Sequence, residues 1–239
     1  MSPLASASSF HTTRWSRVVL ARDPSTEGRE ALQQLCATYY APVIAFLRRE
    51  GRAEEQARDL AHDFFATVLA GSSITQAEQS RGRFRSYLLG AVKHFLSHRR
   101  EAAMRLRRGG GETPLSMEDE ETPVVADPSQ LSPDAAFDRE WALTVLSRAM
   151  EALRLEQAAE GKGAAFERLQ PWLSGEAAHG EQAALAESLG MNVNTLKAAT
   201  HRLRQRFRAL VRAEIATTLE DESAVDEEMQ VLFAALRNR

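Results

Sequence analysis

The chain has 239 residues, of which 44% are hydrophobic and 26% are charged, so it is long enough for one large domain or two small ones. Its single cysteine, Cys36, excludes an internal disulfide framework and a cysteine-rich zinc site. No apolar run approaches the roughly 18–20 residues that cross a bilayer, and residues 1–10 lack the basic and apolar regions of a signal peptide. We therefore expect a cytoplasmic protein without membrane contact.

The placement of glycine and proline favours a helical fold. The 13 glycines and 8 prolines fall mostly between segments of helical periodicity, whereas a β-sandwich needs many turns. Residues 109–133 contain three consecutive glycines, several prolines and many acids, without an apolar period. The predicted fold is all-α, with two helical domains at 10–108 and 135–215, a flexible acidic linker at 109–134 and a C-terminal extension at 216–239.

In the first domain, apolar residues spaced three and four apart predict helices over residues 32–47 and 54–70. Pro42 marks a start or a kink, so the first segment is either one helix or a pair. On the second segment, Asp59, His62 and Asp63 fall opposite the apolar stripe. That face is either simply solvated or a docking surface for a partner.

A third helix is predicted from about residue 83 to residue 108. Its apolar stripe consists of Phe84, Tyr87, Leu88, Ala91 and Phe95. Arg85, Lys93 and Arg100 lie on the other side, where they form a basic face. Such a surface can follow phosphates and stack unpaired bases, and the alternative is an ordinary core with solubilising arginines.

Charge is strongly segregated along the chain. Residues 81–108 hold nine bases and one acid, and residues 189–213 hold six bases and no acid. Acids gather instead in residues 112–140 and 214–228. Two separated basic blocks indicate a polyanionic partner that is contacted at two places. The overall net charge of −3 does not oppose this reading, because binding responds to local potential.

The second domain contains the clearest motif. After helices predicted near 137–155 and 166–173, residues 181–208 fit a helix-turn-helix, with Ala186 where the helices cross and Gly190 in the turn. Asn192 or Asn194 can cap the second helix. The expected interior residues are Leu185, Leu189, Met191, Leu196, Ala199 and Leu203. The expected outward face, suited to base edges and phosphates, carries Asn194, Lys197, His201, Arg204 and Arg208, with Arg202 and Arg206 beside it. The alternative is an ordinary helical hairpin with a basic surface.

The C-terminal extension is predicted to form an amphipathic helix from about residue 223. Its apolar residues are Val225, Met229, Leu232, Phe233 and Leu236, and its first turns are acidic. A stripe of this length is expected to pack on the chain itself or on a partner. It either extends the core of the second domain against the helix at 137–155, or its acids cover a basic helix and mask it.

Together these motifs resemble bacterial RNA polymerase sigma factors of the extracytoplasmic-function (ECF) type. Residues 58–69, RDLAHDFFATVL, resemble the polymerase-docking helix of that family. Residues 83–100, RFRSYLLGAVKHFLSHRR, resemble the element that melts and reads the minus-ten region. Residues 195–204, TLKAATHRLR, resemble the recognition helix of its fourth conserved region, and the opening FHTTRWSRVVLARD is similar to a sub-branch of ECF-like proteins.

The chain departs from the family pattern at several positions. Tyr87 replaces a tryptophan but keeps a ring that can stack, His94 replaces an asparagine, and His62 replaces a glutamine. Ala198 and Ala199 stand where serine and arginine are usual in the recognition helix. The promoter sequence is therefore not carried over from the family.

The resemblance implies a non-enzymatic sigma factor, with core RNA polymerase and promoter DNA, double-stranded and locally melted, as partners. An anti-sigma factor or a Ser/Thr kinase is a further candidate partner. The residues implied in polymerase binding are Asp59, His62, Asp63 and Phe65. Those implied at the minus-ten element are Arg85, Tyr87, Lys93, His94 and Arg100. Those implied at the minus-thirty-five element are Asn194, Thr195, Lys197, His201, Arg202, Arg204 and Arg208.

Two other classes of protein fit parts of the pattern. His94 and His98 have a spacing that a metal can use, but no third ligand, phosphate loop or HExxH motif accompanies them. We therefore expect no metal site, no cofactor and no enzyme. A transcriptional regulator that binds DNA only through the helix-turn-helix explains the second basic block, but it leaves the first block and the Asp59/Asp63 face without a role.

Overall fold

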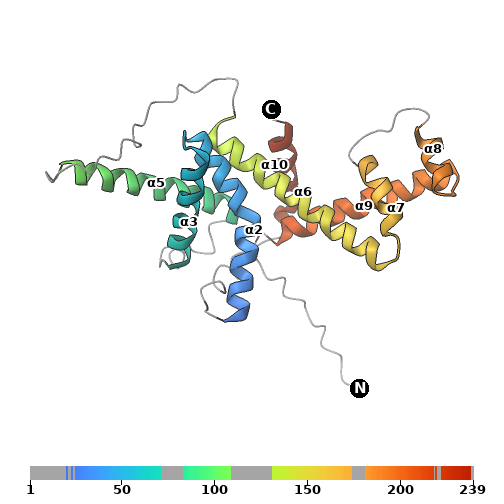
Figure 1. Ribbon diagram of the computed structural model, residues 1–239, viewed down its shortest axis with the longest axis horizontal. Coiled ribbons are helices and arrows are strands. Elements are labelled where there is room, and N and C mark those ends of the chain that lie inside the picture. Colours follow the sequence, from blue (N-terminus) through green and yellow to red (C-terminus); the bar gives the residue numbers. More distant parts are fainter. Residues whose placement is uncertain are drawn as a thin grey trace, which may run out of the picture. The chain divides into compact units, whose positions relative to one another are not determined.

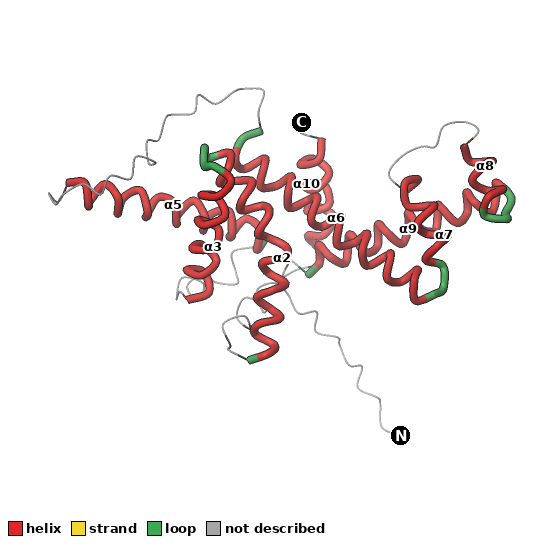
Figure 2. The backbone as a smooth tube through the Cα atoms, viewed as in Figure 1, coloured by secondary structure: helices red, strands yellow, loops and turns green. Residues whose placement is uncertain are grey.

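The computed structural model describes residues 20, 23, 25–70, 83–108, 131–173, 181–217, 219 and 222–237. Within these residues every regular element is a helix, which confirms the all-α fold (Figures 1 and 2). The predicted linker lies outside the described residues except for its last four. The α-helices are α2 (Thr26–Arg49), α3 (Glu54–Ala70), α5 (Phe84–Arg108), α6 (Pro133–Ala159), α7 (Gly163–Leu169), α8 (Glu181–Ser188), α9 (Val193–Ala216) and α10 (Val225–Arg237). Two short 3₁₀ helices cover Gln170–Leu173 and Glu222–Ala224.

The chain forms two compact units, and one of them is discontinuous in sequence. Unit 1 comprises Met1–Leu143 together with Ala216–Arg239, and unit 2 comprises Thr144–Ile215. The division therefore falls inside α6, and not at the predicted linker. The C-terminal helix α10 groups with unit 1, whereas one of the two predictions had placed it on the core of the second domain.

Unit 1 is built around a core of aromatic residues. Helix α2 begins at a cap where the Gly28 N–H donates to Ser25 Oγ at 3.1 Å. It runs as one helix through Pro42, and Gly51, with a φ of 86°, lets the chain turn toward α3. Tyr39 of α2 packs against Phe84 of α5, with ring centroids 5.2 Å apart.

The rest of that core joins α3, α5 and the start of α6. Phe64 of α3 meets Phe95 of α5 edge to face at 5.7 Å between centroids. On α6, Phe137 and Trp141 are fully buried. The first turns of α6 thus belong to the interior of unit 1, which explains why the unit extends beyond the predicted end of the first domain.

Unit 2 has a separate aliphatic core. Buried side chains of α6, α7, α8 and α9 meet there, and they are Leu153, Phe166, Leu169, Ala186, Leu196 and Leu203. The residues predicted to face inward at the α8–α9 turn are either part of this cluster or packed against it. The outward side of α9 is consequently left to polar residues.

Candidate nucleic-acid interface

The start of α9 is fixed by its own turn. Gly190 has a φ of 66°, which favours glycine, and its N–H donates to the Glu187 carbonyl oxygen at 3.0 Å at the end of α8. Asn192 then caps α9, because its Oδ1 accepts hydrogen bonds from the Thr195 N–H at 2.8 Å and the Thr195 hydroxyl at 3.1 Å. Of the two predicted caps, the structure uses Asn192, and Asn194 stays on the surface.

The polar face of α9 is a narrow stripe. At about 100° per residue, five predicted side chains fall within about 80° of the helix circumference, opposite Leu196 and Leu203. All five are exposed to solvent. They are Asn194, Lys197, His201, Arg204 and Arg208. One exposed helix face therefore carries an amide, an imidazole and three cations at successive turns.

Neighbouring groups neutralise only some of the cations on α9. Arg206 makes two hydrogen bonds to the Glu156 carboxylate, at 2.8 and 2.6 Å, which lower the pKa of Glu156. Arg204 donates to the Trp172 carbonyl oxygen at 2.7 Å. Lys197, Arg202 and Arg208 pair with no carboxylate in the part of the chain that the structure describes. Their charges are therefore available to an external anion.

The basic face of α5 differs from that of α9, because carboxylates from neighbouring segments form ion pairs with its cations. Lys93 Nζ lies 2.7 Å from Asp134 of α6, and Arg100 lies 3.1 Å from Glu50 at the end of α2. Arg99 pairs with Asp63 of α3. In this conformation, the surface predicted to contact the minus-ten DNA is largely neutralised by the chain itself.

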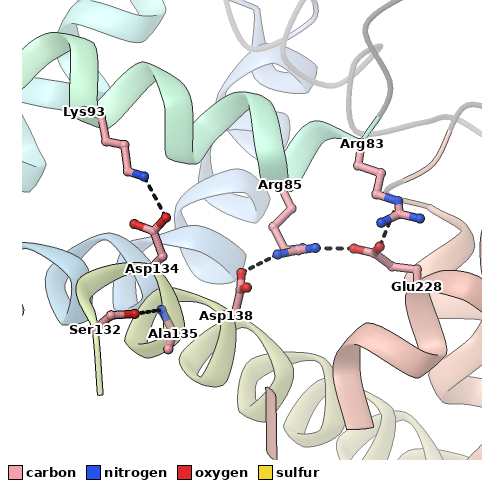
Figure 3. Close-up of polar contacts among 8 residues, drawn as sticks. All are labelled: Arg83, Arg85, Lys93, Ser132, Asp134, Ala135, Asp138 and Glu228. Carbon is pink, nitrogen blue, oxygen red and sulfur yellow. Dashed lines mark hydrogen bonds and ion pairs between the residues drawn. The ribbon is translucent and has the colours of Figure 1, made fainter. Parts of the chain in front are cut away.

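Arg85 is not on the surface at all, contrary to the prediction. Its side chain is 8% exposed, donates from Nε to Glu228 of α10 at 2.9 Å and also pairs with Asp138 of α6 (Figure 3). The guanidinium lies 4.8 Å from the ring centroid of Trp141. The physical reason is that the starts of α6 and α10 cover the first turn of α5, so this residue faces the interior.

Arg83 extends the same cluster. It pairs with Glu227 at 2.8 Å, and its Nε lies 3.0 Å from the second carboxylate oxygen of Glu228 (Figure 3). The Glu228 side chain is fully buried, whereas the Glu227 side chain is 73% exposed. Two guanidinium groups thus face three carboxylates, including Asp138, and only Arg85 and Glu228 among them are buried.

Burial and ion pairing act in opposite directions on the pKa values of Asp138 and Arg85. Burial raises the pKa of the Asp138 carboxyl above its ordinary value, although the Arg85 guanidinium acts to lower it. Burial also acts to lower the pKa of Arg85, but the carboxylates of Glu228 and Asp138 raise it further, so the net shift is upward. Arg85 therefore stays charged, and burial makes the Asp138 carboxyl harder to ionise than an exposed one.

The other two residues predicted at the minus-ten element keep partial access to solvent. Tyr87 is half-buried, with its ring 6.1 Å from that of Phe84. His94 is exposed, and its Nε2 lies 3.0 Å from Nε2 of His98, so one ring nitrogen donates to the other. Neither residue is brought into the ion cluster around Arg85.

The predicted polymerase-binding residues of α3 divide into exposed and buried ones. Asp59, His62 and Asp63 are exposed, and His62 Nε2 is hydrogen-bonded to the Tyr40 hydroxyl at 2.9 Å. Phe65 is only 8% exposed and packs against Phe64, so its prediction as a direct contact is corrected. It lies on the apolar side of α3, where its ring centroid is also 6.3 Å from that of Tyr40.

Sequence reasoning missed Arg83, Asp138, Trp141 and Glu228 as a connected group. A signal was present for Glu228, which follows Val225 by three residues and precedes Leu232 by four, and so falls on the apolar side of its helix. An acid on an apolar face indicates a buried cationic partner. The local sequence pattern does not show which cation pairs with Glu228, because that pairing depends on how the helices pack.

No protein-family model, no curated protein and no solved structure matches this chain. Within the described residues, none of the helices combines the length and the hydropathy that crossing a bilayer requires. The same residues bring no three histidine, cysteine or acidic side chains together in a way that could hold a metal ion.

Proposed function

We propose that the chain is a sigma factor that binds core RNA polymerase and directs it to specific promoters. The observation that carries the proposal is the outward face of α9, where Lys197, Arg202 and Arg208 have no carboxylate partner among the described residues. A capped helix that follows a tight turn and presents an amide, an imidazole and cations is suited to the major groove of duplex DNA.

Two further features support a polymerase subunit over a simple DNA-binding protein. Asp59 and Asp63 are exposed one turn apart on α3. Asp63 pairs with Arg99, whereas Asp59 pairs with no cation among the described residues and offers its charge to a basic partner. A second basic helix, α5, lies in the other compact unit, and its half-buried Tyr87 has a ring suited to stacking on a melted base. Duplex recognition, strand melting and polymerase docking would then use three separate surfaces.

A second candidate is a transcriptional regulator that binds DNA through α9 and does not join polymerase. One observation favours it, because the cations Arg85, Lys93, Arg99 and Arg100 of α5 are all paired with carboxylates of the chain itself. In that case α9 provides the DNA-binding surface, and the α5 ion pairs only stabilise the fold.

Capture by immobilised core RNA polymerase distinguishes the two candidates. We expect the wild-type chain to be retained, and the Asp59→Arg/Asp63→Arg variant to be lost, because like charges then face the basic partner. Glu27→Arg/Glu30→Arg is the matched control, since it makes the same charge change at exposed positions of α2 and should be retained.

The Asp63 substitution also removes the ion pair with Arg99, so the single Asp59→Arg variant is measured beside the double one. Retention of the acidic-face variants at the wild-type level would reject the docking surface. A wild-type chain that binds duplex promoter DNA but is not captured by polymerase would leave the regulator as the function.

A further inference from the structure

The contact between α5 and α10 is made through charged groups as well as apolar ones. On α10, Val225, Met229, Leu232 and Ala235 are buried as expected for an amphipathic helix. Glu228 is buried among them, and it meets Arg85 and Arg83 at the first turn of α5. Figure 3 shows Arg85 between Glu228 on one side and Asp138 of α6 on the other.

The contact between α5 and α10 contains buried charges, so its stability depends on which opposite charges lie beside them. A buried ion pair contributes little net stability compared with apolar groups of the same volume, because desolvation offsets most of the attraction. A buried charge left without a partner is strongly destabilising. Separation of α10 from α5 puts Glu228 and the two arginines into water, so its cost comes mainly from the apolar residues of α10. An external anion that binds Arg83 and Arg85 offsets part of that cost.

Nucleic-acid phosphates are suited to that replacement. Arginine binds phosphate and carboxylate with the same two-pronged geometry, and binding also releases counterions from the nucleic acid. Tyr87, half-buried one turn from Arg83, offers a ring near the same place. The carboxylates that are displaced regain solvent, and the gain is greatest for the fully buried Glu228.

We propose that α10 and the first turns of α6 form a clasp over the start of α5, and that single-stranded nucleic acid opens it by placing phosphates on Arg83 and Arg85. The inference rests on the proposed function in one respect, because it takes α5 to be a nucleic-acid-binding helix. Until the clasp opens, the unit holds α5 in a neutralised form with low affinity for polyanions.

The first test measures affinity for a single-stranded oligonucleotide of about 20 nucleotides by fluorescence anisotropy. All variants carry Lys197→Ala and Arg208→Ala, which remove two exposed cations of α9 that would otherwise contribute to binding. Glu228→Gln weakens the clasp. Glu30→Gln is the matched control, because it makes the same charge change at an exposed position of α2 that is in the same unit but outside the ion cluster.

We expect Glu228→Gln to tighten binding at least about fivefold, because a larger fraction of the chain is open, and Glu30→Gln to change it by less than about twofold. Equal tightening by both variants would indicate a general charge effect and overturn the clasp. Unchanged affinity of Glu228→Gln, or no binding by the background chain at all, would overturn it as well.

The second test uses the wild-type chain and covers the case in which Glu228→Gln does not fold. Amide hydrogen exchange of residues 225–237 is followed by mass spectrometry with and without the oligonucleotide. We expect faster exchange of α10 in the complex. Slower or unchanged exchange of α10 while the oligonucleotide is bound would refute the opening step.

Neither test contains polymerase, so the two proposals fail separately. Loss of polymerase capture with an intact clasp response would reject the sigma factor and retain a gated nucleic-acid-binding protein. Normal polymerase capture without any clasp response would retain the sigma factor and assign the Glu228–Arg85 pair to the permanent core of unit 1.

Discussion

Replacement of Arg85 by methionine should destabilise unit 1 by about 3–5 kcal/mol, which is the range for removal of one partner from a buried ion pair. The magnitude follows from the burial of the partner left behind. The Glu228 side chain is fully buried, and after the substitution only Arg83 remains beside it. The effect therefore arises from an unbalanced buried carboxylate more than from lost packing, since methionine fills a similar volume.

The double variant Arg85→Met/Glu228→Leu isolates that cause. It removes both buried charges and keeps the volume, so its free energy of unfolding should lie within about 1 kcal/mol of the wild-type value. Asp138 loses its arginine partner in both variants, but its side chain is 27% exposed and keeps contact with water. Arg100→Met is the matched control, because Arg100 pairs with Glu50 at the surface and should contribute less than about 1 kcal/mol.

Urea unfolding followed by tryptophan fluorescence measures these differences. Trp141 is buried in unit 1 and lies against Arg85, so it reports this unit when Trp15 and Trp172 are replaced by phenylalanine. The reasoning is refuted if Arg85→Met costs no more than Arg100→Met. It is also refuted if the double variant is as unstable as the single one, because the loss would then come from packing and not from charge.

Three further predictions concern single groups. Burial raises the pKa of Asp138, so its protonated form favours the folded state. The stability of the wild type relative to Asp138→Asn should therefore be greatest at low pH and fall as the pH rises through the folded pKa. Urea unfolding at pH 4 and pH 7 measures this difference. A larger advantage of the wild type at pH 7 would mean that the Arg85 charge outweighs burial. Asn192→Ala removes the cap of α9 and should destabilise unit 2 by about 1 kcal/mol in thermal unfolding, whereas the same change at the exposed Asn194 should cost less. Lys197→Ala/Arg208→Ala should reduce the slope of log affinity against log salt for duplex DNA by about 1–2, and an unchanged slope would show that neither side chain meets a phosphate.

Local sequence patterns predicted the elements well where each helix is decided by its own residues. The limits of α3, the inward residues of the α8–α9 turn and the cap at Asn192 follow from periodicity and side-chain chemistry. These features depend on neighbours within a few residues. The same reasoning placed Lys197, His201 and Arg208 on an exposed face, where the structure also has them.

The pattern was misleading where a second helix decides which face is buried. On α5 the predicted Phe84 and Leu88 are buried, but the predicted Tyr87, Ala91 and Phe95 are only half-buried. The side of the helix that is buried is the one that carries Leu88, Val92 and Leu96. Arg85 precedes these three by three, seven and eleven residues, so it lies on the same side of the helix. Only the packing of α6 and α10 on that side makes Arg85 an interior residue, and neither contact is visible in the sequence of α5 itself.

The discontinuity of unit 1 has a consequence for how the protein is made. A ribosome produces α2, α3 and α5 first, then the whole of unit 2, and α10 last. Unit 2 has all its residues before α10 is synthesised, so it can fold while the chain is still growing. Unit 1 waits for its last helix, and in that interval Arg83 and Arg85 lack the carboxylates of α10. The order of synthesis thus creates a period in which Asp138 alone compensates the two arginines at the start of α5, and this period ends when translation has delivered Glu227 and Glu228.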